Sequence, residues 1–146
     1  MNWQPGDCRP GDMIRVRIGS FYHYGVFVSE EEVISYGLPP IERFANEPDR
    51  LKVLATDIDV FACGGIVEIA VPDRKERRKR LPAKKIIETA RSRIGEDQYD
   101  LLHNNCEHFA NECVFGESRS LLEEAARERW LAQKARARDA GQDTGR

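Results

Sequence analysis

The chain has the length of one ordinary domain and a nearly balanced charge. It has 146 residues, with 23 Lys and Arg against 25 Asp and Glu, and 40% of its residues are hydrophobic. A chain of this length buries a core without support from disulfides or metals. The balance of charge excludes an acidic disordered protein and disfavours a DNA-coating one, so we expect a globular domain with no nucleic-acid partner.

The sequence contains no recognisable targeting or membrane-spanning segment. Its most apolar run, 60–67, is short and contains two glycines, whereas a spanning helix needs roughly 18 to 20 apolar residues. The N-terminal residues have neither the basic nor the apolar region of a signal peptide. The four cysteines form no CxxC pair and no dense disulfide framework. We therefore expect a soluble, cytoplasmic protein.

The first half of the chain has the alternating pattern of β-strands. Along 22–28, Tyr22 and Tyr24 fall on one face, and His23 and Gly25 fall on the other. An acidic turn then returns the chain into another strand, which predicts a β-meander. The predicted elements are strands at 13–18, 22–28 and 33–36, a long loop at 37–50, and further strands at about 51–61 and 66–71.

The second half has the three-four spacing of helices. One helix begins at Pro82 and stops at Gly95, and another begins at Asn104-Asn105 and ends at Gly116. Strands followed by helices indicate an α+β fold with a small, mostly antiparallel sheet packed against helices. We expect a domain over 1–120, a charged amphipathic helix over 117–140, which Ser118 can cap, and a frayed tail at 141–146.

The segment 103–108, His-Asn-Asn-Cys-Glu-His, is the densest cluster of reactive side chains. Cys106 falls in the first turn of a predicted helix, where unpaired N–H groups favour the thiolate. Asn104 and Glu107 match a capping box that would fix the start of this helix. Many cysteines at helix starts are inert, so these local features alone do not assign catalysis.

A nucleophilic cysteine needs a base, and the nearest histidines are poorly placed to serve. His108 lies two residues along the helix from Cys106, about 200° around its axis, and His103 precedes the helix. His23 is the better candidate, because Gly25 on the same strand face has no side chain to block a close-packed helix. A lone strand histidine is more often structural than catalytic, so this pairing needs further support.

Two other features have weaker functional interpretations. His103, Cys106, His108 and Cys113 are zinc-ligand types, but four ligands along one helix do not converge tetrahedrally, so we expect no metal and no cofactor. The basic run 74–85 is typical of a solvated loop. Its functional alternative is peripheral contact with an anionic membrane through Arg77, Arg78, Lys79 and Arg80.

Four segments together resemble the lecithin:retinol acyltransferase-like family. They are Pro10-Gly-Asp-Met-Ile14, Phe21-Tyr-His-Tyr-Gly-Val-Phe-Val28, Leu81-Pro-Ala-Lys-Lys-Ile-Ile87 and Asn105-Cys-Glu-His-Phe109. The resemblance runs from about residue 9 to about 120. That family is similar to a circularly permuted form of the NlpC-type, papain-like cysteine peptidases, so the resemblance implies a permuted papain-like architecture.

The resemblance implies a catalytic role for residues that the local pattern left open. It implies Cys106 as nucleophile and His23 as base, with a thioester acyl-enzyme formed during acyl transfer or hydrolysis of lipid esters. The backbone N–H of Cys106 is the natural oxyanion donor. Tyr22, Arg17 and Asn105 are candidates for oxyanion or substrate contacts.

One departure from the family bears on the third catalytic position. Animal members carry a second histidine on the following strand, and the matching residue here is Ser35. A serine hydroxyl can accept a hydrogen bond from an imidazole but lacks its reach, so we take Ser35 as a provisional orienter, with Tyr36 as the alternative. The sequence also lacks the hydrophobic C-terminal tail of several animal relatives.

Three functions remain open at this point. The leading hypothesis is a soluble thiol acyltransferase or acyl hydrolase that acts on lipid esters through Cys106, His23 and Ser35. The alternatives are a cysteine peptidase or amidase of NlpC type, and a catalytically lapsed binding module that docks a partner through the basic run. The sequence predicts neither the acyl donor, nor the acceptor, nor the oligomeric state.

Overall fold

The computed structural model describes residues 1–38 and 51–144, with side chains described as far as residue 140. Its described elements are strands β1 (Asn2–Pro5), β2 (Met13–Ile18), β3 (Phe21–Ser29), β4 (Glu32–Tyr36), β5 (Val53–Thr56) and β6 (Val67–Val71), and helices α1 (Ile58–Ala62), α2 (Arg74–Lys79), α3 (Ala83–Ser92), α4 (Cys106–Phe115) and α5 (Leu121–Thr144). The predicted loop at 37–50 falls largely outside the described residues, as does the end of the predicted tail, 145–146.

The strands form one sheet in the order β1-β6-β2-β3-β4-β5, and every neighbouring pair is antiparallel. This confirms the predicted α+β class with an antiparallel sheet. The meander β2-β3-β4 is also confirmed, with Val16 opposite His23 and Gly25 opposite Ser35. Strand β3 therefore lies near the middle of the sheet, between β2 and β4.

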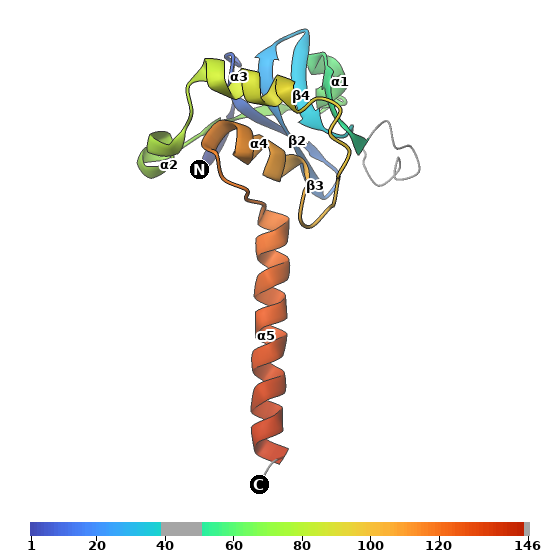
Figure 1. Cartoon of the computed structure of the whole chain (residues 1–146), viewed down its shortest axis with the longest axis vertical. Coiled ribbons are helices and arrows are strands. Elements are labelled where there is room, and N and C mark those ends of the chain that lie inside the picture. The colour runs from blue at the N-terminus through green and yellow to red at the C-terminus, as the bar shows by residue number, and fades with distance from the viewer. Residues whose placement is uncertain (39–50, 145–146) are drawn as a thin grey trace.

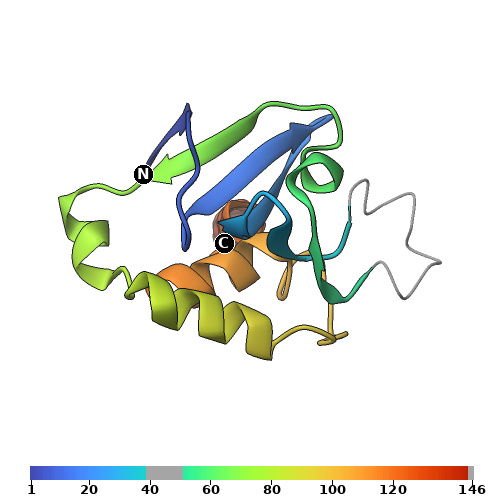
Figure 2. The ribbon, with the colours of Figure 1, turned by 90° about the horizontal axis from the view of Figure 1, so that it is seen from above.

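Helices cover both faces of the sheet. On one face, Tyr24 and Val26 of β3 join Phe109 of α4 and Ile86 of α3 in the larger core cluster. Helices α3 and α4 lie side by side along this face (Figures 1 and 2). On the other face, Phe27 and its neighbours pack around Phe61 of α1 in a smaller cluster. Successive residues of β3 thus enter two different cores, as strand alternation requires.

Helix α5 extends away from the rest of the molecule (Figure 1). Its first turns, 122–126, are half-buried, whereas every side chain from Arg127 to Ala140 is exposed. The predicted helix in this region therefore begins at Leu121, three residues beyond its predicted cap. Among the described residues, no helix is both long and apolar enough to cross a bilayer.

The fold corrects three predicted elements. The strand expected over 51–61 is only β5, because Asp57 ends it and caps α1 by accepting a hydrogen bond from the Val60 N–H at 2.9 Å. The basic run is not a loop over its whole length, since α2 begins there with a capping box between Asp73 and Glu76. Strand β1 was not predicted. It pairs with β6, which lies more than sixty residues later in the chain.

Candidate active site

Asn105 fixes the start of α4. Its side-chain oxygen accepts hydrogen bonds from the N–H groups of Glu107 (2.9 Å) and His108 (3.1 Å). In return, His108 Nδ1 accepts the Asn105 N–H at 3.0 Å, which completes a capping box. The predicted box of Asn104 with Glu107 is therefore wrong by one residue, although the predicted helix start is right. Cys106 stands directly after this cap, as the first residue of the helix.

The thiol of Cys106 is buried, with 6% of the residue exposed. Burial raises its pKa to about 11, and the nearby charge of Glu107 acts in the same direction. The N–H groups of Tyr24, Cys106 and Glu107 oppose this rise in pKa by favouring the thiolate. The sulfur therefore lies beside the backbone of β3 at Tyr24, one residue from His23, in a site that contains hydrogen-bond donors for an anion.

His23 lies on the face of the sheet that α1 covers. Its ring stacks on Phe61 with the centroids 5.0 Å apart, and burial lowers its pKa to about 4. Neither ring nitrogen has a hydrogen-bond partner among the described residues. Gly25 provides the space on this face, because a Cβ there would lie 2.7 Å from Cε2 of Phe61. Helix α1 occupies that space, whereas we expected the helix that begins at Cys106 to pack there.

Cys106 and His23 nevertheless border the same cavity. Among the described residues, strand β4 pairs with β3 from Gly25 onward, and the residues of β3 before Gly25 line the cavity. This cavity has a volume of about 210 Å³ and a mainly apolar lining. It lies between the beginning of β3, the segment before α4 and the beginning of α5, and its apolar lining includes Ile18, Phe21, Tyr22, Tyr99, Leu101, Leu121 and Leu122.

The other predicted site residues differ in their relation to this cavity. Tyr22 lines it, with the guanidinium of Arg15 stacked 3.8 Å from the centre of its ring. Arg17 does not line it, and its Nε donates to the Gly19 carbonyl at 3.1 Å. Asn105 lines it, but both Asn105 Nδ2 donors are used, toward the Leu101 carbonyl and the Ser120 hydroxyl.

Ser35 is fully buried and shares the strand face of Gly25, its direct partner across β3 and β4. Its hydroxyl donates to the Gly37 carbonyl at 3.1 Å. No hydrogen bond joins it to His23, whose ring nitrogens have no described partner. The structure therefore brings Cys106, His23, Tyr22 and Asn105 to one cavity. Ser35 is not among the residues that line this cavity.

The sequence did not reveal that the start of α5 forms part of the site. Glu107 accepts the Leu121 N–H at 2.8 Å and so caps α5 from α4. The Nε2 of His108 binds Glu123, and because Nδ1 is already an acceptor, Nε2 must carry the proton. His103 Nδ1 contacts the other oxygen of Glu123 at 3.2 Å, and both contacts lower the pKa of that carboxyl.

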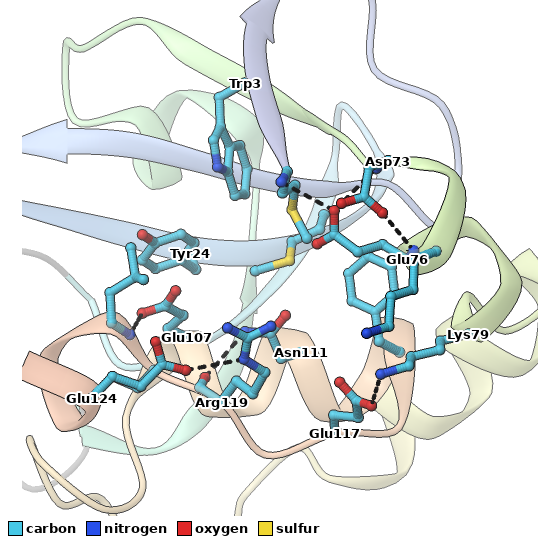
Figure 3. A pocket seen from close by; sticks show the side chains of 16 residues that line it. Trp3, Tyr24, Asp73, Glu76, Lys79, Glu107, Asn111, Glu117, Arg119 and Glu124 are labelled. Carbon is cyan, nitrogen blue, oxygen red and sulfur yellow. Dashed lines mark hydrogen bonds and ion pairs between the residues drawn. The ribbon is translucent and has the colours of Figure 1, made fainter. Parts of the chain in front are cut away.

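A second cavity lies on the other side of Glu107, with a volume of about 380 Å³ (Figure 3). Tyr24, Glu107, Ser120 and Leu121 line both cavities and form the wall between them. The second cavity is bordered by charged side chains held in pairs, including Lys79 with Glu117 and Arg119 with Glu124 (Figure 3). The first cavity is thus mainly apolar and the second about equally polar and apolar, with the first turn of α4 between them.

The four residues considered as zinc ligands, His103, Cys106, His108 and Cys113, are not gathered around one point. His103 and His108 both contact Glu123, and Cys113 is buried in the larger core cluster, seven residues along α4 from Cys106. Within the described ranges, no group of three or more His, Cys, Asp or Glu side chains is arranged to hold a metal ion. All four cysteines are free thiols.

Comparison with known proteins assigns the chain to a family. The family model described as lecithin retinol acyltransferase matches residues 6–119, which include strands β2 to β6 and helices α1 to α4. The chain belongs to this family. Helix α5 lies beyond the matched region.

Curated relatives have acyl-transfer or lipase names. The chain is 27% identical over 124 residues to lecithin retinol acyltransferase of Mus musculus, a match that covers 73% of this chain and 54% of that protein. It is 28% identical over 120 residues to phospholipase A and acyltransferase 3 of Homo sapiens, covering 77% and 74% respectively. This chain therefore spans about half the length of the first relative and about three quarters of the second.

Proposed function

We propose that this chain is a cysteine-dependent acyltransferase or acyl hydrolase that acts on lipid esters through a thioester acyl-enzyme. The main observation in support is that Cys106, at the start of α4, lines an apolar cavity together with His23. Membership of the family and the names of the relatives support an acyl substrate. The apolar lining suits an acyl chain, because burying apolar surface is favourable.

The proposed reaction follows from the groups at the cavity. His23 takes the proton of the Cys106 thiol as the sulfur attacks the acyl carbonyl carbon, and the resulting oxyanion accepts a hydrogen bond from the Cys106 N–H. The imidazolium then protonates the leaving alcohol, which leaves a thioester. Water or an acceptor amine or alcohol attacks that thioester, with His23 again as base, and the thiol is restored. No cofactor takes part in this sequence.

We propose that the His23 ring, which stacks on Phe61 in the structure, moves during proton transfer. Support for such a movement is that both ring nitrogens have no described partner while fully buried, a state that costs about 1–3 kcal/mol per unsatisfied polar group. The sulfur lies beside the Tyr24 N–H, one residue along the strand from His23, and both side chains line the same cavity. Ser35 is proposed as a positioning residue for that ring.

The proposal also includes peripheral contact of α2 with an anionic membrane. Of the basic residues named above, Lys79 pairs with Glu117 at 2.6 Å, and Arg80 contacts Asp12 at 3.5 Å. Arg77 and Arg78 form no ion pair with another described residue and are the stronger contributors. Replacing all four by Ser should weaken adsorption to anionic vesicles at low salt, and unchanged adsorption would remove α2 from the proposal.

The direct test is capture of the acyl-enzyme. The protein is incubated with a soluble short-chain activated ester, quenched in acid and measured by intact mass. We expect an acyl adduct that is lost in Cys106→Ala and retained in Cys113→Ala, a control that removes another buried thiol of the same helix. His23→Gln should slow adduct formation by about 10²- to 10⁴-fold, the usual contribution of a general base.

The lack of a described hydrogen-bond partner for either His23 ring nitrogen favours one rival function, a binding module that no longer catalyses. In that case no adduct forms with esters, and Cys106 reacts with iodoacetamide no faster than its raised pKa allows. A cysteine peptidase or amidase would instead cleave peptide or amide substrates in a reaction that also needs Cys106. An adduct with esters alone supports the acyltransferase or acyl hydrolase.

A further inference from the structure

Helix α5 separates its charges by face. With Trp130 as reference and about 100° per residue, the basic residues between 126 and 140 all lie within about 120° of it. The acidic residues of the same stretch, Glu128 and Asp139, lie about 160° to 180° away. We call the first surface the basic face of α5; it consists of Trp130, Arg127, Arg129, Lys134, Arg136 and Arg138.

The basic face forms no hydrogen bond or ion pair with the described part of the domain outside α5. All of its side chains are exposed, and Trp130 is 56% exposed. None of its basic residues forms an ion pair with another described residue, and Lys134 instead stacks over Trp130 at 5.0 Å. A helix of 24 residues is about 36 Å long, and most of this length lies beyond the domain (Figure 1). Such a surface offers positive charge and an exposed aromatic ring.

The same side of α5 leads to the apolar cavity. Leu122, Ala126 and Trp130 follow one another at i, i+4 spacing, so they form a continuous stripe along the helix. Leu122 lines the cavity that contains Cys106, and the exposed side chains of Phe21, Leu101 and Leu121 border that cavity. A surface that bound the basic face would therefore lie next to the opening of the proposed catalytic site.

We propose that the basic face of α5 docks on an anionic lipid surface and so presents the Cys106 cavity to lipid. This rests on the proposed function. Basic residues flank Trp130 on both sides, so the surface combines positive charge, which anionic headgroups attract, with an aromatic ring of the kind enriched at membrane interfaces. The same flanks would repel a second copy of the helix. A single aromatic residue gives little base stacking, which disfavours single-stranded nucleic acid.

The experiment compares three forms of the full chain by vesicle co-sedimentation. The basic-face variant replaces Arg127, Arg129, Lys134, Arg136 and Arg138 by Gln, which preserves helix propensity. The control carries Glu128→Gln and Asp139→Asn on the opposite face. The probes are vesicles of phosphatidylcholine alone and of phosphatidylcholine with about a third phosphatidylserine, the latter at low and high salt. Circular dichroism checks that α5 remains helical in each form.

We expect the wild-type chain to bind the anionic vesicles at low salt and to release them at high salt. The basic-face variant should bind about a hundredfold more weakly, because each basic residue near the surface contributes to adsorption. The control should bind at least as tightly as the wild type. Trp130→Ala should also weaken binding, whereas Trp130→Phe should largely retain it.

The outcome is read separately from catalysis. Acylation of Cys106 by the soluble ester should be unchanged in the basic-face variant, and Cys106→Ala should still bind vesicles. If acylation is absent but vesicle binding is intact, the proposed function is contradicted and the docking proposal is not. Undiminished vesicle binding by the basic-face variant would overturn the docking proposal. Adsorption that depends only on α2, or binding of an RNA oligomer but no vesicle, would overturn it equally.

Discussion

The two faces of β3 hold the two halves of the proposed catalytic pair in different environments. On one face, Tyr24 joins α4 and the thiol of Cys106, which lies among backbone N–H donors. On the other, His23 stacks on Phe61 of α1 with no described hydrogen-bond partner. The thiol thus has anion-stabilising neighbours, whereas the imidazole has an apolar one. Both side chains nevertheless line the same apolar cavity, where the proposed chemistry would bring them together.

Removing the aromatic anchor of either face should have the largest effect on stability. Phe61 and Phe109 are both fully buried, one on each face of the sheet. Phe61→Ala and Phe109→Ala should each lower the free energy of unfolding by about 3–5 kcal/mol, measured by urea denaturation. If these variants do not fold, the corresponding Leu substitutions give the same comparison with a smaller loss of stability.

The two anchors should differ in their effect on Cys106. Phe109 shares its core cluster with the cysteine, whereas Phe61 belongs to the cluster on the opposite face. We expect alkylation of Cys106 to become faster when Phe109 is truncated and to change little when Phe61 is truncated. Equal acceleration in both variants would contradict the separation of the two faces.

The reactivity of Cys106 should rise steeply with pH. Its pKa is raised to about 11 by burial, so the thiolate fraction grows tenfold for each pH unit below that value. Alkylation by iodoacetamide, read at the Cys106 peptide by mass spectrometry, should therefore accelerate about a hundredfold between pH 7 and pH 9. Exposed Cys63 serves as an internal comparison. A rate that levels off near neutral pH would mean that the imidazole already pairs with the thiol.

The structure also predicts how His23 links stability to pH. Its pKa falls from 6.5 to about 4 on folding because of burial, so the unfolded chain binds the extra proton between these values. The resulting stability is complete above pH 6.5 and is lost as the pH falls toward 4. Between pH 7 and pH 5 the loss should be about 2 kcal/mol. Urea denaturation of wild type and His23→Gln at both values isolates it; equal pH dependence would contradict a buried neutral imidazole.

Local signals predicted α4 and its ends to within about one residue, whereas elements defined by distant partners were missed. Helix α4 has a capping Asn105, apolar residues at three-four spacing and Gly116 in the left-handed region at its end. In contrast, β1 is a short strand whose pairing with β6 depends on a segment over sixty residues away. Helix α1 is only five residues long and was included in a predicted strand; its helix signals are the cap Asp57 and the acidic Asp59 in its first turn.

The candidate site was predictable to the same extent and for the same reasons. The position of Cys106 at a helix start follows from nearby residues, as does the strand face of His23. The partner of that face was not predictable, because Phe61 belongs to the helix that the sequence pattern concealed. The contribution of α5 was also missed, since the contacts of Glu107 and His108 with its first turn join segments that have no shared pattern.

Ser35 offers the smallest and most selective change on the His23 face. Its hydroxyl makes one hydrogen bond, to the Gly37 carbonyl, so Ser35→Ala should lower the free energy of unfolding by only about 1 kcal/mol. If Ser35 positions the His23 ring during catalysis, kcat for the soluble ester falls while KM is unchanged, and the pH profile shifts; Ser35→Thr, which keeps the hydroxyl, should recover part of the rate. A merely structural Ser35 would alter stability alone, which would leave orientation of the imidazole to groups other than this serine.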